Sequence, residues 1–417
     1  MKIAVIDHIG NPGGGSRVVR ALLPAIKTVR PDIDITFFGN KNNIIRENLS
    51  EEFSDFNINI RCLTSANLKI KGILGIKGSD FVISVIQERY NKALSVLPPF
   101  LSGETHKEIE RLVTSYDLAF FTWPYFLSCP KLNCPMIGIF HDFNYKYYFS
   151  GSHVLNRNQI NMLNRDMPIW LSRSIPVVST YFMASEIKKF YPEWADKVRI
   201  VHLAPFTRGT IINTDESIKT IQRLGLKKKY VLCPTNICSH KNIGPLLSAI
   251  YILNNRMGQD LNLVLTGPGT EIINGHATEI GIEMGGEPTD VIGLGYVTNT
   301  QIDSLIQRAS VVVNTSLYEA GNGSGLDAWE MGTPVAMSNI PSFIEHLEVQ
   351  GLLAEVFDPR NPLDIAEKIY SITYNKGKVE LNVKKSLEAI KIITWENTAL
   401  KYIKIFEDAI FSCNNEH

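Results

Sequence analysis

The segment from residue 295 to residue 341 carries the side chains best suited to chemistry. An apolar run at 310–314, expected to be a strand, leads through polar residues to Glu319 and then to the glycine-rich loop at 320–325. A helix is expected directly after this loop. Glycines let a backbone approach a ligand closely, and the N–H groups and dipole of a helix N-terminus favour an anion. The segment therefore predicts an anion-binding loop.

Two acidic residues flank this loop. Glu319 stands just before it, and Asp327 follows eight positions later, inside the expected helix. Backbone amides suit a pyrophosphate, and carboxylates suit hydroxyl groups, so the combination fits a sugar nucleotide. A glycine-rich loop between a strand and a helix also serves other phosphate binders.

A second group of polar residues lies upstream, at 234–242, where the expected strand 230–233 ends. Lys241 in this group can neutralise pyrophosphate charge, and His240 stands beside it. In the first half of the chain, the expected strand 136–140 ends at His141. The carboxyl end of a strand is where α/β proteins bind ligands, so His141 is a candidate site residue.

These side chains must be positioned by alternating strands and helices. Apolar runs rich in Val, Ile and Phe alternate with amphipathic segments, which predicts α/β structure with parallel sheets. The expected strands are residues 3–6, 33–38, 118–122, 136–140, 177–179, 198–202, 230–233, 261–266, 291–294, 310–314 and 335–338. The clearest expected helices are residues 16–29, 245–254, 303–308 and about 395–411.

A polar break near 206–217 divides the chain into two α/β series. We predict domains at 1–207 and 208–392, with a final helical segment at 393–417. A chain of 417 residues is long enough for two such domains.

The composition excludes several classes of function. Lys plus Arg and Asp plus Glu both count 42, and no basic stripe stands out, which argues against a nucleic-acid partner. The six cysteines form no C-x-x-C pair. No export signal or membrane-spanning run is present, so a soluble cytoplasmic protein is expected.

The second half of the chain resembles the retaining family-4 glycosyltransferases of the GT-B fold. Glu319 and Asp327 match the two acids of the family's E-x7-E signature, and Lys241 with Asn242 matches its K-N pair. Gly295 matches a strand-end glycine, and residues 332–335 match the G-x-P-V turn. Trp395 matches the closing Trp of a C-terminal crossover helix, which implies that the last segment returns to the first domain.

The resemblance implies roles for these residues. Glu319 would contact hydroxyls of the donor sugar, Asp327 the ribose diol, and Lys241 the pyrophosphate. Glu319, Lys241 and His141, which matches a His near the donor sugar, are the expected catalytic residues. The expected donor site also includes Gly14, Gly15, Asn236, His240, Gly295, Val297, Gly321, Asn322 and Gly323.

The chain departs from the family pattern at two positions. Asp327 is one methylene shorter than the usual Glu, which puts its reach to the ribose in doubt. Asn236 stands where many members carry an Arg, five residues before the Lys, so one phosphate cation is missing. His240 is a partial replacement, as in a branch of the family with H-K-N.

These observations predict transfer of a hexose from a GDP- or UDP-hexose, mannose preferred, to a glycan or lipid-linked glycan. Retention of configuration, no metal or other cofactor, and a role in bacterial surface polysaccharide or lipopolysaccharide synthesis are expected from the resemblance. Two alternatives remain: a sugar-nucleotide epimerase on the same fold, and an inactive glycan-binding subunit.

Three further features have competing interpretations. Asp32 and Asp34 have the D-x-D form of metal-dependent transferases, but their place at a strand entry favours a structural role. His8 is likewise expected to be structural. The Lys-rich apolar stretch 68–77 fits either peripheral contact with an anionic membrane or lipid-linked acceptor, or a half-buried loop. The sequence leaves the oligomeric state open.

Overall fold

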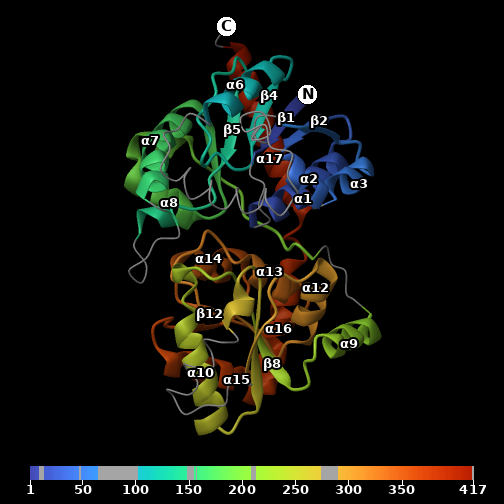
Figure 1. Cartoon of the computed structure of the whole chain (residues 1–417), viewed down its shortest axis with the longest axis vertical. Coiled ribbons are helices and arrows are strands. Elements are labelled where there is room, and N and C mark those ends of the chain that lie inside the picture. The colour runs from blue at the N-terminus through green and yellow to red at the C-terminus, as the bar shows by residue number, and fades with distance from the viewer. Residues whose placement is uncertain are drawn as a thin grey trace, which may run out of the picture.

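A computed structural model describes residues 1–8, 14–46, 48–63, 102–147, 155, 157–207, 213–273 and 290–415. Residues 9–13, which precede the predicted donor residues Gly14 and Gly15, lie outside the described residues, as do the Lys-rich stretch 68–77 and residues 208–212 of the predicted break. The described parts form two lobes, stacked along the long axis of the molecule (Figure 1).

The first lobe contains a seven-stranded parallel sheet in the order β3-β2-β1-β4-β5-β6-β7. Its strands are β1 (Lys2–Asp7), β2 (Asp34–Gly39), β3 (Asn59–Cys62), β4 (Leu118–Phe121), β5 (Met136–Ile139), β6 (Ile175–Val178) and β7 (Arg199–Ile200). Its helices are α1 (Gly14–Val29), α2 (Lys41–Arg46), α3 (Leu49–Ser54), α6 (Ser102–Leu112), α7 (Arg157–Arg173) and α8 (Tyr181–Phe190), with 3-10 turns η1 (Asn144–Lys146) and η2 (Pro192–Lys197).

The second lobe contains a six-stranded parallel sheet in the order β10-β9-β8-β11-β12-β13. Its strands are β8 (Lys229–Pro234), β9 (Leu261–Thr266), β10 (Val291–Gly293), β11 (Val311–Asn314), β12 (Val335–Ser338) and β13 (Glu355–Phe357). Its helices are α9 (Thr214–Arg223), α10 (Ile243–Arg256), α12 (Asn299–Arg308), α13 (Gly323–Glu330), α14 (Pro341–Gln350), α15 (Pro362–Tyr374) and α16 (Lys376–Ile390), with 3-10 turns η3 (Ser239–Lys241) and η4 (Thr270–Ile272).

The prediction of parallel α/β structure is confirmed, and two strands were missed. The edge strand β3 is largely exposed, so its residues lack the apolar run that marks a buried strand. Strand β13 has only three residues, too few for a pattern to show. The central strands β4, β5 and β9 are buried along their whole length, as expected for strands covered on both faces.

The last helix, α17 (Trp395–Asn415), returns to the first lobe and packs against α1 (Figure 1). The predicted apolar positions Ala399, Tyr402, Ile403 and Phe406 are buried in the core between these helices and the first sheet. Burial of large apolar side chains of this kind contributes roughly 2–3 kcal/mol each. The Trp395 indole N–H also donates to the Pro205 carbonyl at 2.6 Å, which ties the start of α17 to the segment linking the lobes.

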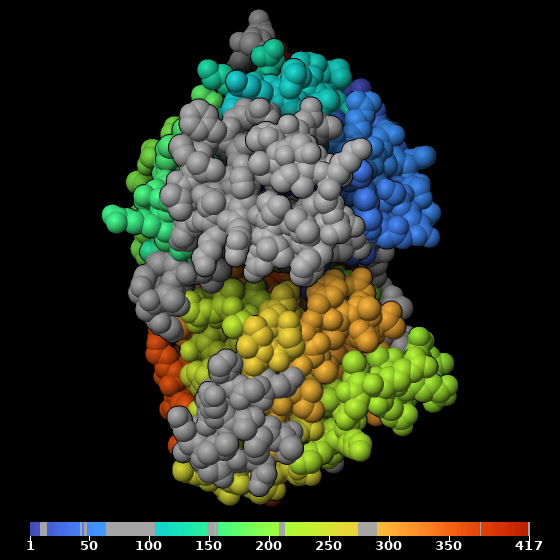
Figure 2. Space-filling model, viewed as in Figure 1, coloured from blue at the N-terminus to red at the C-terminus, as the bar shows by residue number. Residues whose placement is uncertain are grey.

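In the space-filling view, α12 lies at the upper end of the lower lobe and α9 projects from its side (Figure 2). Within the part of the chain that the structure describes, no helix combines the length and the apolar character needed to cross a bilayer.

Candidate functional site

The predicted site residues gather where the two sheets end toward each other. His141 and Asp142 follow β5 in the first lobe, Lys241 closes the turn η3 after β8, and Glu319 follows β11 in the second lobe. The charges of Lys241 and Glu319 both act on the Asp142 carboxyl. Carboxyl ends of parallel strands are the usual place for ligands in α/β folds.

Lys241 and Glu319 form an ion pair, with side chains 20% and 17% exposed. The Ser316 hydroxyl donates to Glu319 Oε1 at 2.6 Å and holds that carboxylate in place. Burial alone would lower the pKa of Lys241, but the charge and hydrogen bond of Glu319 outweigh burial and raise the pKa. The lysine therefore stays positively charged in surroundings only partly open to water. We call the region where these strand ends meet, around His141, Asp142, Lys241 and Glu319, the crevice.

Asn242 fixes the backbone at the Lys241 position. It adopts a left-handed conformation with φ of 53°, which Asn tolerates better than most residues. Its side-chain amide donates to the carbonyls of Thr315 and Pro359, at 3.2 and 2.6 Å. The K-N pair thus combines a charged group with the residue that orients it.

His141 lies at the first lobe's side of the crevice, stacked on Trp123 with ring centroids 4.5 Å apart. Its Nε2 donates to the Thr122 carbonyl at 2.8 Å, so the neutral ring keeps Nδ1 as its acceptor. Burial lowers the pKa of His141 to about 4, and the ring is neutral at pH 7. Gly15 packs against this stack, since a Cβ there would come within 2.9 Å of the Trp123 ring.

Asp142 is a site residue that the sequence analysis did not single out. Its Oδ1 accepts from the Asn144 amide at 3.1 Å. Burial, helped by the nearby Glu319 charge, raises the pKa of Asp142 to about 6, although the Asn144 amide and the Lys241 charge oppose the shift. The signal that could have found it was its place directly after His141 at the same strand end.

Asp327 is placed differently from the prediction. Its carboxylate is 1% exposed and accepts from the Arg17 guanidinium at 2.7 Å and from the Phe206 amide at 2.6 Å. Arg17 lies in α1 and also stacks over the Phe206 ring, 4.3 Å from its centroid. Both carboxylate oxygens bind groups of the chain itself, and through them Asp327 joins the two lobes. The predicted contact of Asp327 with a ribose stays a prediction.

The glycine-rich loop also differs from the prediction. Asn322 is buried, and its side-chain oxygen accepts from the Gly325 amide at 2.9 Å to cap α13. Its own backbone amide donates to His346 Nε2 at 3.0 Å. Burial lowers the pKa of His346 to about 4, so the ring stays neutral and able to accept. In this structure the His346 ring therefore occupies the Asn322 amide that was predicted to bind pyrophosphate.

Neighbouring contacts hold the loop against the first lobe. The hydroxyls of Ser179 and Thr180 donate to the Ala320 carbonyl at 2.9 and 3.0 Å. Gly321 lies beside Ser179 and His346, and a Cβ on Gly323 would lie 3.1 Å from the Phe206 ring. The loop therefore forms part of the interface between the lobes.

The remaining predicted donor residues line the ends of the second sheet. The side-chain oxygen of Asn236 is buried and has no hydrogen-bond partner among the described residues. Burial, with the Lys241 charge, lowers the pKa of His240 to about 4. Gly295 has φ of 68°, and its amide donates to the Thr270 hydroxyl at 3.0 Å, which makes it a turn residue. Val297 packs on the core of the second lobe.

The last residues named from the sequence are the predicted donor residue Gly14 and the residues with competing interpretations. Gly14 is the first residue of α1. His8 Nε2 bonds the Tyr125 carbonyl at 3.0 Å, and burial lowers the pKa of His8 to about 4. Asp32 pairs with Arg30, as the structural interpretation predicted. Among the described residues, no group of three or more His, Cys, Asp or Glu side chains is arranged to hold a metal ion.

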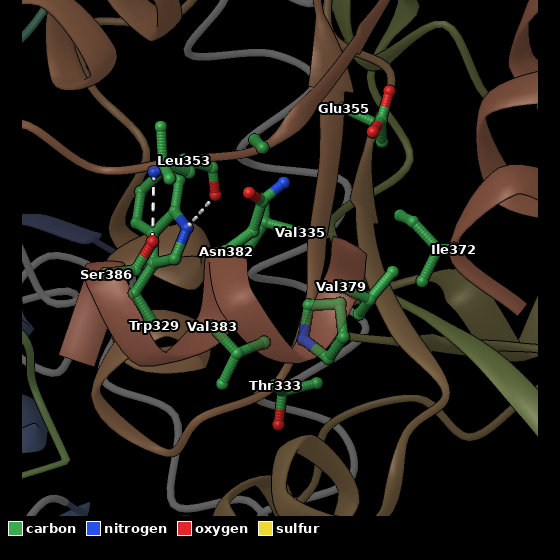
Figure 3. A pocket seen from close by; sticks show the side chains of 12 residues that line it. Trp329, Thr333, Val335, Leu353, Glu355, Ile372, Val379, Asn382, Val383 and Ser386 are labelled. Atoms are coloured by element: carbon green, nitrogen blue, oxygen red, sulfur yellow. Dashed lines mark hydrogen bonds between the residues drawn. The ribbon is translucent and has the colours of Figure 1, made fainter. Parts of the chain in front are cut away.

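A small cavity of about 20 Å³ lies in the second lobe between α13, β12 and α16 (Figure 3). Its lining includes Trp329, whose indole N–H donates to the Leu353 carbonyl at 2.8 Å, and Val335 at the first position of β12. The cavity therefore lies at the amino end of β12, away from the crevice. Its volume suits about one water molecule.

Two parallel α/β lobes with facing carboxyl ends and a returning C-terminal helix define the GT-B fold. Solved structures share it over almost the whole chain. The Anabaena protein HepE in complex with UDP-glucose is 14% identical, covers 98% of this chain and 100% of its own, and gives a TM-score of 0.69. WaaG, a glycosyltransferase involved in lipopolysaccharide biosynthesis, is 10% identical, with 97% and 99% covered and a TM-score of 0.67. The predicted GT-B fold is confirmed.

Residues 228–375 match the family model of Glycosyl transferases group 1. An uncharacterised glycosyltransferase of Methanocaldococcus jannaschii is 23% identical over 235 residues, which is 55% of this chain and 58% of that protein. The O-antigen chain mannosyltransferase B of Escherichia coli is 26% identical over 230 residues, 54% of this chain and 58% of that protein. The matches thus span 58% of the length of each of these relatives.

Proposed function

We propose that this chain is a glycosyltransferase that moves a sugar from a nucleoside-diphosphate donor to an acceptor hydroxyl. The observation that carries the proposal is the Lys241–Glu319 ion pair, set between the two sheets opposite His141 and Asp142. The match of residues 228–375 to Glycosyl transferases group 1 supports the same activity.

Each side chain has a chemical task in this proposal. In the reaction, the bond from the anomeric carbon to the diphosphate breaks and a bond to the acceptor oxygen forms. Lys241 stabilises the negative charge that develops on the leaving diphosphate, because a fixed cation in a partly dry crevice acts strongly. When the diphosphate binds, its oxygens replace Glu319 as the partner of Lys241, and the Glu319 carboxylate accepts hydrogen bonds from sugar hydroxyls. The acceptor proton passes to the leaving phosphate.

The finer parts of the proposal rest on resemblance. We assign the chain to the retaining family-4 type, with the donor held by residues 208–392 and the acceptor by residues 1–207. A GDP- or UDP-hexose is the donor; the name of the Escherichia coli relative favours mannose and a surface glycan, free or lipid-linked, as acceptor. No metal is used, and the protein works in the cytoplasm, with peripheral membrane contact where the acceptor is lipid-linked.

The first experiment identifies a donor by thermal shift with UDP-glucose, UDP-galactose and GDP-mannose, since a bound donor raises the melting temperature by mass action. Release of nucleoside diphosphate is then measured for Glu319→Ala and Lys241→Ala. Each variant is expected to lose at least about 100-fold in turnover. Matched controls are Glu52→Ala, a partly buried paired acid in α3, and Lys378→Ala, a paired lysine in α16.

Three outcomes contradict the proposal. Wild-type turnover in both Glu319→Ala and Lys241→Ala would show that these residues do not form the donor site. Conversion of the donor to an epimer without an acceptor indicates an epimerase. Tight glycan binding without binding of any nucleotide sugar indicates an inactive glycan-binding subunit.

A further inference from the structure

Asp142 is held rigidly after the carboxyl end of β5 in the first sheet. The Tyr125 hydroxyl donates to the Asp142 carbonyl at 2.5 Å and accepts from the Asp142 amide at 3.1 Å. Tyr125 is itself buried in the core of the first lobe. Both backbone groups of Asp142 are therefore fixed by one buried side chain, and the carboxylate projects from a rigid support.

A single cross-lobe hydrogen bond aligns Asp142 with Glu319. The amide of Phe143, the next residue, donates to the Tyr318 hydroxyl at 3.1 Å. Tyr318 directly precedes Glu319 and lies buried in the core of the first lobe, packed against Phe182. Phe143, which follows Asp142, is thus hydrogen-bonded to Tyr318, which precedes Glu319.

The crevice then holds two carboxylates and one ammonium group. Asp142 Oδ1 accepts only the Asn144 amide, and Oδ2 has no hydrogen-bond partner among the described residues. Glu319 is already paired with Lys241. Two negative groups facing one cation in a partly dry site are unfavourable together unless donors lie between them. Sugar hydroxyls are neutral donors of this kind.

We propose that Asp142 is a sugar-binding residue that accepts hydrogen bonds from hydroxyls of the transferred sugar, opposite Glu319, and restricts the donor to neutral sugars. The inference rests on the proposed function. A donor whose sugar carries a carboxylate, such as a uronic acid, would place a third negative charge against Asp142 and Glu319. The two acids therefore both bind a neutral hexose and reject a uronate.

The test measures binding to the full chain by calorimetry, with UDP, UDP-glucose and UDP-glucuronate, or with GDP and GDP-mannose if thermal shift selects guanosine. Asp142→Asn keeps the shape of the side chain and removes its charge. Asp142→Asn is expected to weaken binding of the nucleotide sugar at least about 10-fold, since a hydrogen bond to a charged group is lost. The affinity for the free nucleoside diphosphate is expected to change by less than about twofold. Discrimination against UDP-glucuronate is expected to fall about 10-fold.

A second variant and a control keep the result interpretable. Tyr318→Phe removes the hydroxyl that aligns the two acids. It is expected to weaken binding of the nucleotide sugar about threefold to fivefold and to leave binding of the nucleoside diphosphate unchanged. Asp117→Asn removes an exposed acid at the opposite end of the same sheet, whose carboxylate binds the Lys2 amide, and is expected to change nothing.

The outcomes separate this inference from the proposed function. Wild-type sugar binding and wild-type rejection of UDP-glucuronate in Asp142→Asn overturn the role of Asp142 while leaving the transferase intact. Equal weakening of diphosphate and nucleotide sugar also overturns it, because the residue would then support the lobe and not the sugar. If the wild-type chain binds none of these nucleotides, the proposed function itself fails.

Discussion

The Arg17–Asp327 and Lys241–Glu319 ion pairs have different surroundings, although both acids lie in the same short segment, residues 319–327. Asp327 is 1% exposed and is bonded across the lobes, whereas Glu319 is 17% exposed and its lysine comes from the same lobe. Each pair has a third carboxylate beside it. Burial and the Asp327 charge raise the pKa of Asp303 to about 7, and burial raises that of Asp142 to about 6.

Two acids of one sequence signature thus have different surroundings, which under the proposed function correspond to a structural and a chemical role. Asp327 is buried with both oxygens bonded within the chain, and it holds the lobes together. Glu319 is partly open and can exchange its partner for a ligand. Four predictions test this distinction.

The largest expected effect is that of Asp327→Ala on stability. Removing this acid leaves the Phe206 amide without its acceptor and the Arg17 guanidinium, which is 39% exposed, without its partner. The free energy of unfolding is expected to fall by about 3 kcal/mol. Denaturant unfolding measures it, with Glu319→Ala for comparison at about 1 kcal/mol. Unchanged stability combined with weaker nucleotide binding would support the ribose contact of Asp327.

The two neighbouring carboxylates give the next effect, which depends on pH. A carboxyl with a raised pKa binds its proton more tightly in the folded state, so it stabilises the fold at low pH and this stability is lost as pH rises. Asp142→Asn and Asp303→Asn are therefore expected to stabilise the protein by about 2–3 kcal/mol at pH 8, after allowance for solvent screening.

The advantage should fade between pH 7 and pH 4. The measurement is the difference between each variant and the wild type, because His8, His141, His240 and His346 have pKa values near 4 and destabilise every variant equally in acid. A difference that does not change with pH would show that neither carboxylate has a raised pKa.

Arg17→Lys tests the geometry of the cross-lobe pair. Lysine keeps the charge but loses the planar contact with the Phe206 ring, so about 1 kcal/mol of stability should be lost. Lys241→Arg is the matched change in the other pair and should affect transfer more than unfolding. An effect on transfer from Arg17→Lys alone would give Arg17 a place in the donor site.

Ser316→Ala has the smallest expected effect. It removes the hydroxyl that orients Glu319 Oε1, a bond worth about 1 kcal/mol, so the transfer rate should fall about fivefold. The free energy of unfolding should fall by no more than about the same 1 kcal/mol. Ser248→Ala, in an exposed position of α10, is the control.

The sequence was sufficient for the fold, and it placed Lys241, Glu319 and His141 at strand ends that meet in the structure. It could not predict the partner of Asp327, because Arg17 lies 310 positions away and only the packing of the lobes brings the two together. The contact of the Asn322 amide with His346 was missed for the same reason, since His346 comes from another helix. Asp142 was overlooked because its importance depends on charges from the opposite lobe.

The return of α17 to the first lobe has a consequence for biosynthesis. The last strand of the first sheet ends at residue 200, whereas its covering helix begins at residue 395. During translation the apolar face that receives Tyr402 and Phe406 has no cover until the ribosome has passed α17. The second lobe can complete its own core first, and nascent chains that stop short of α17 should depend on chaperones.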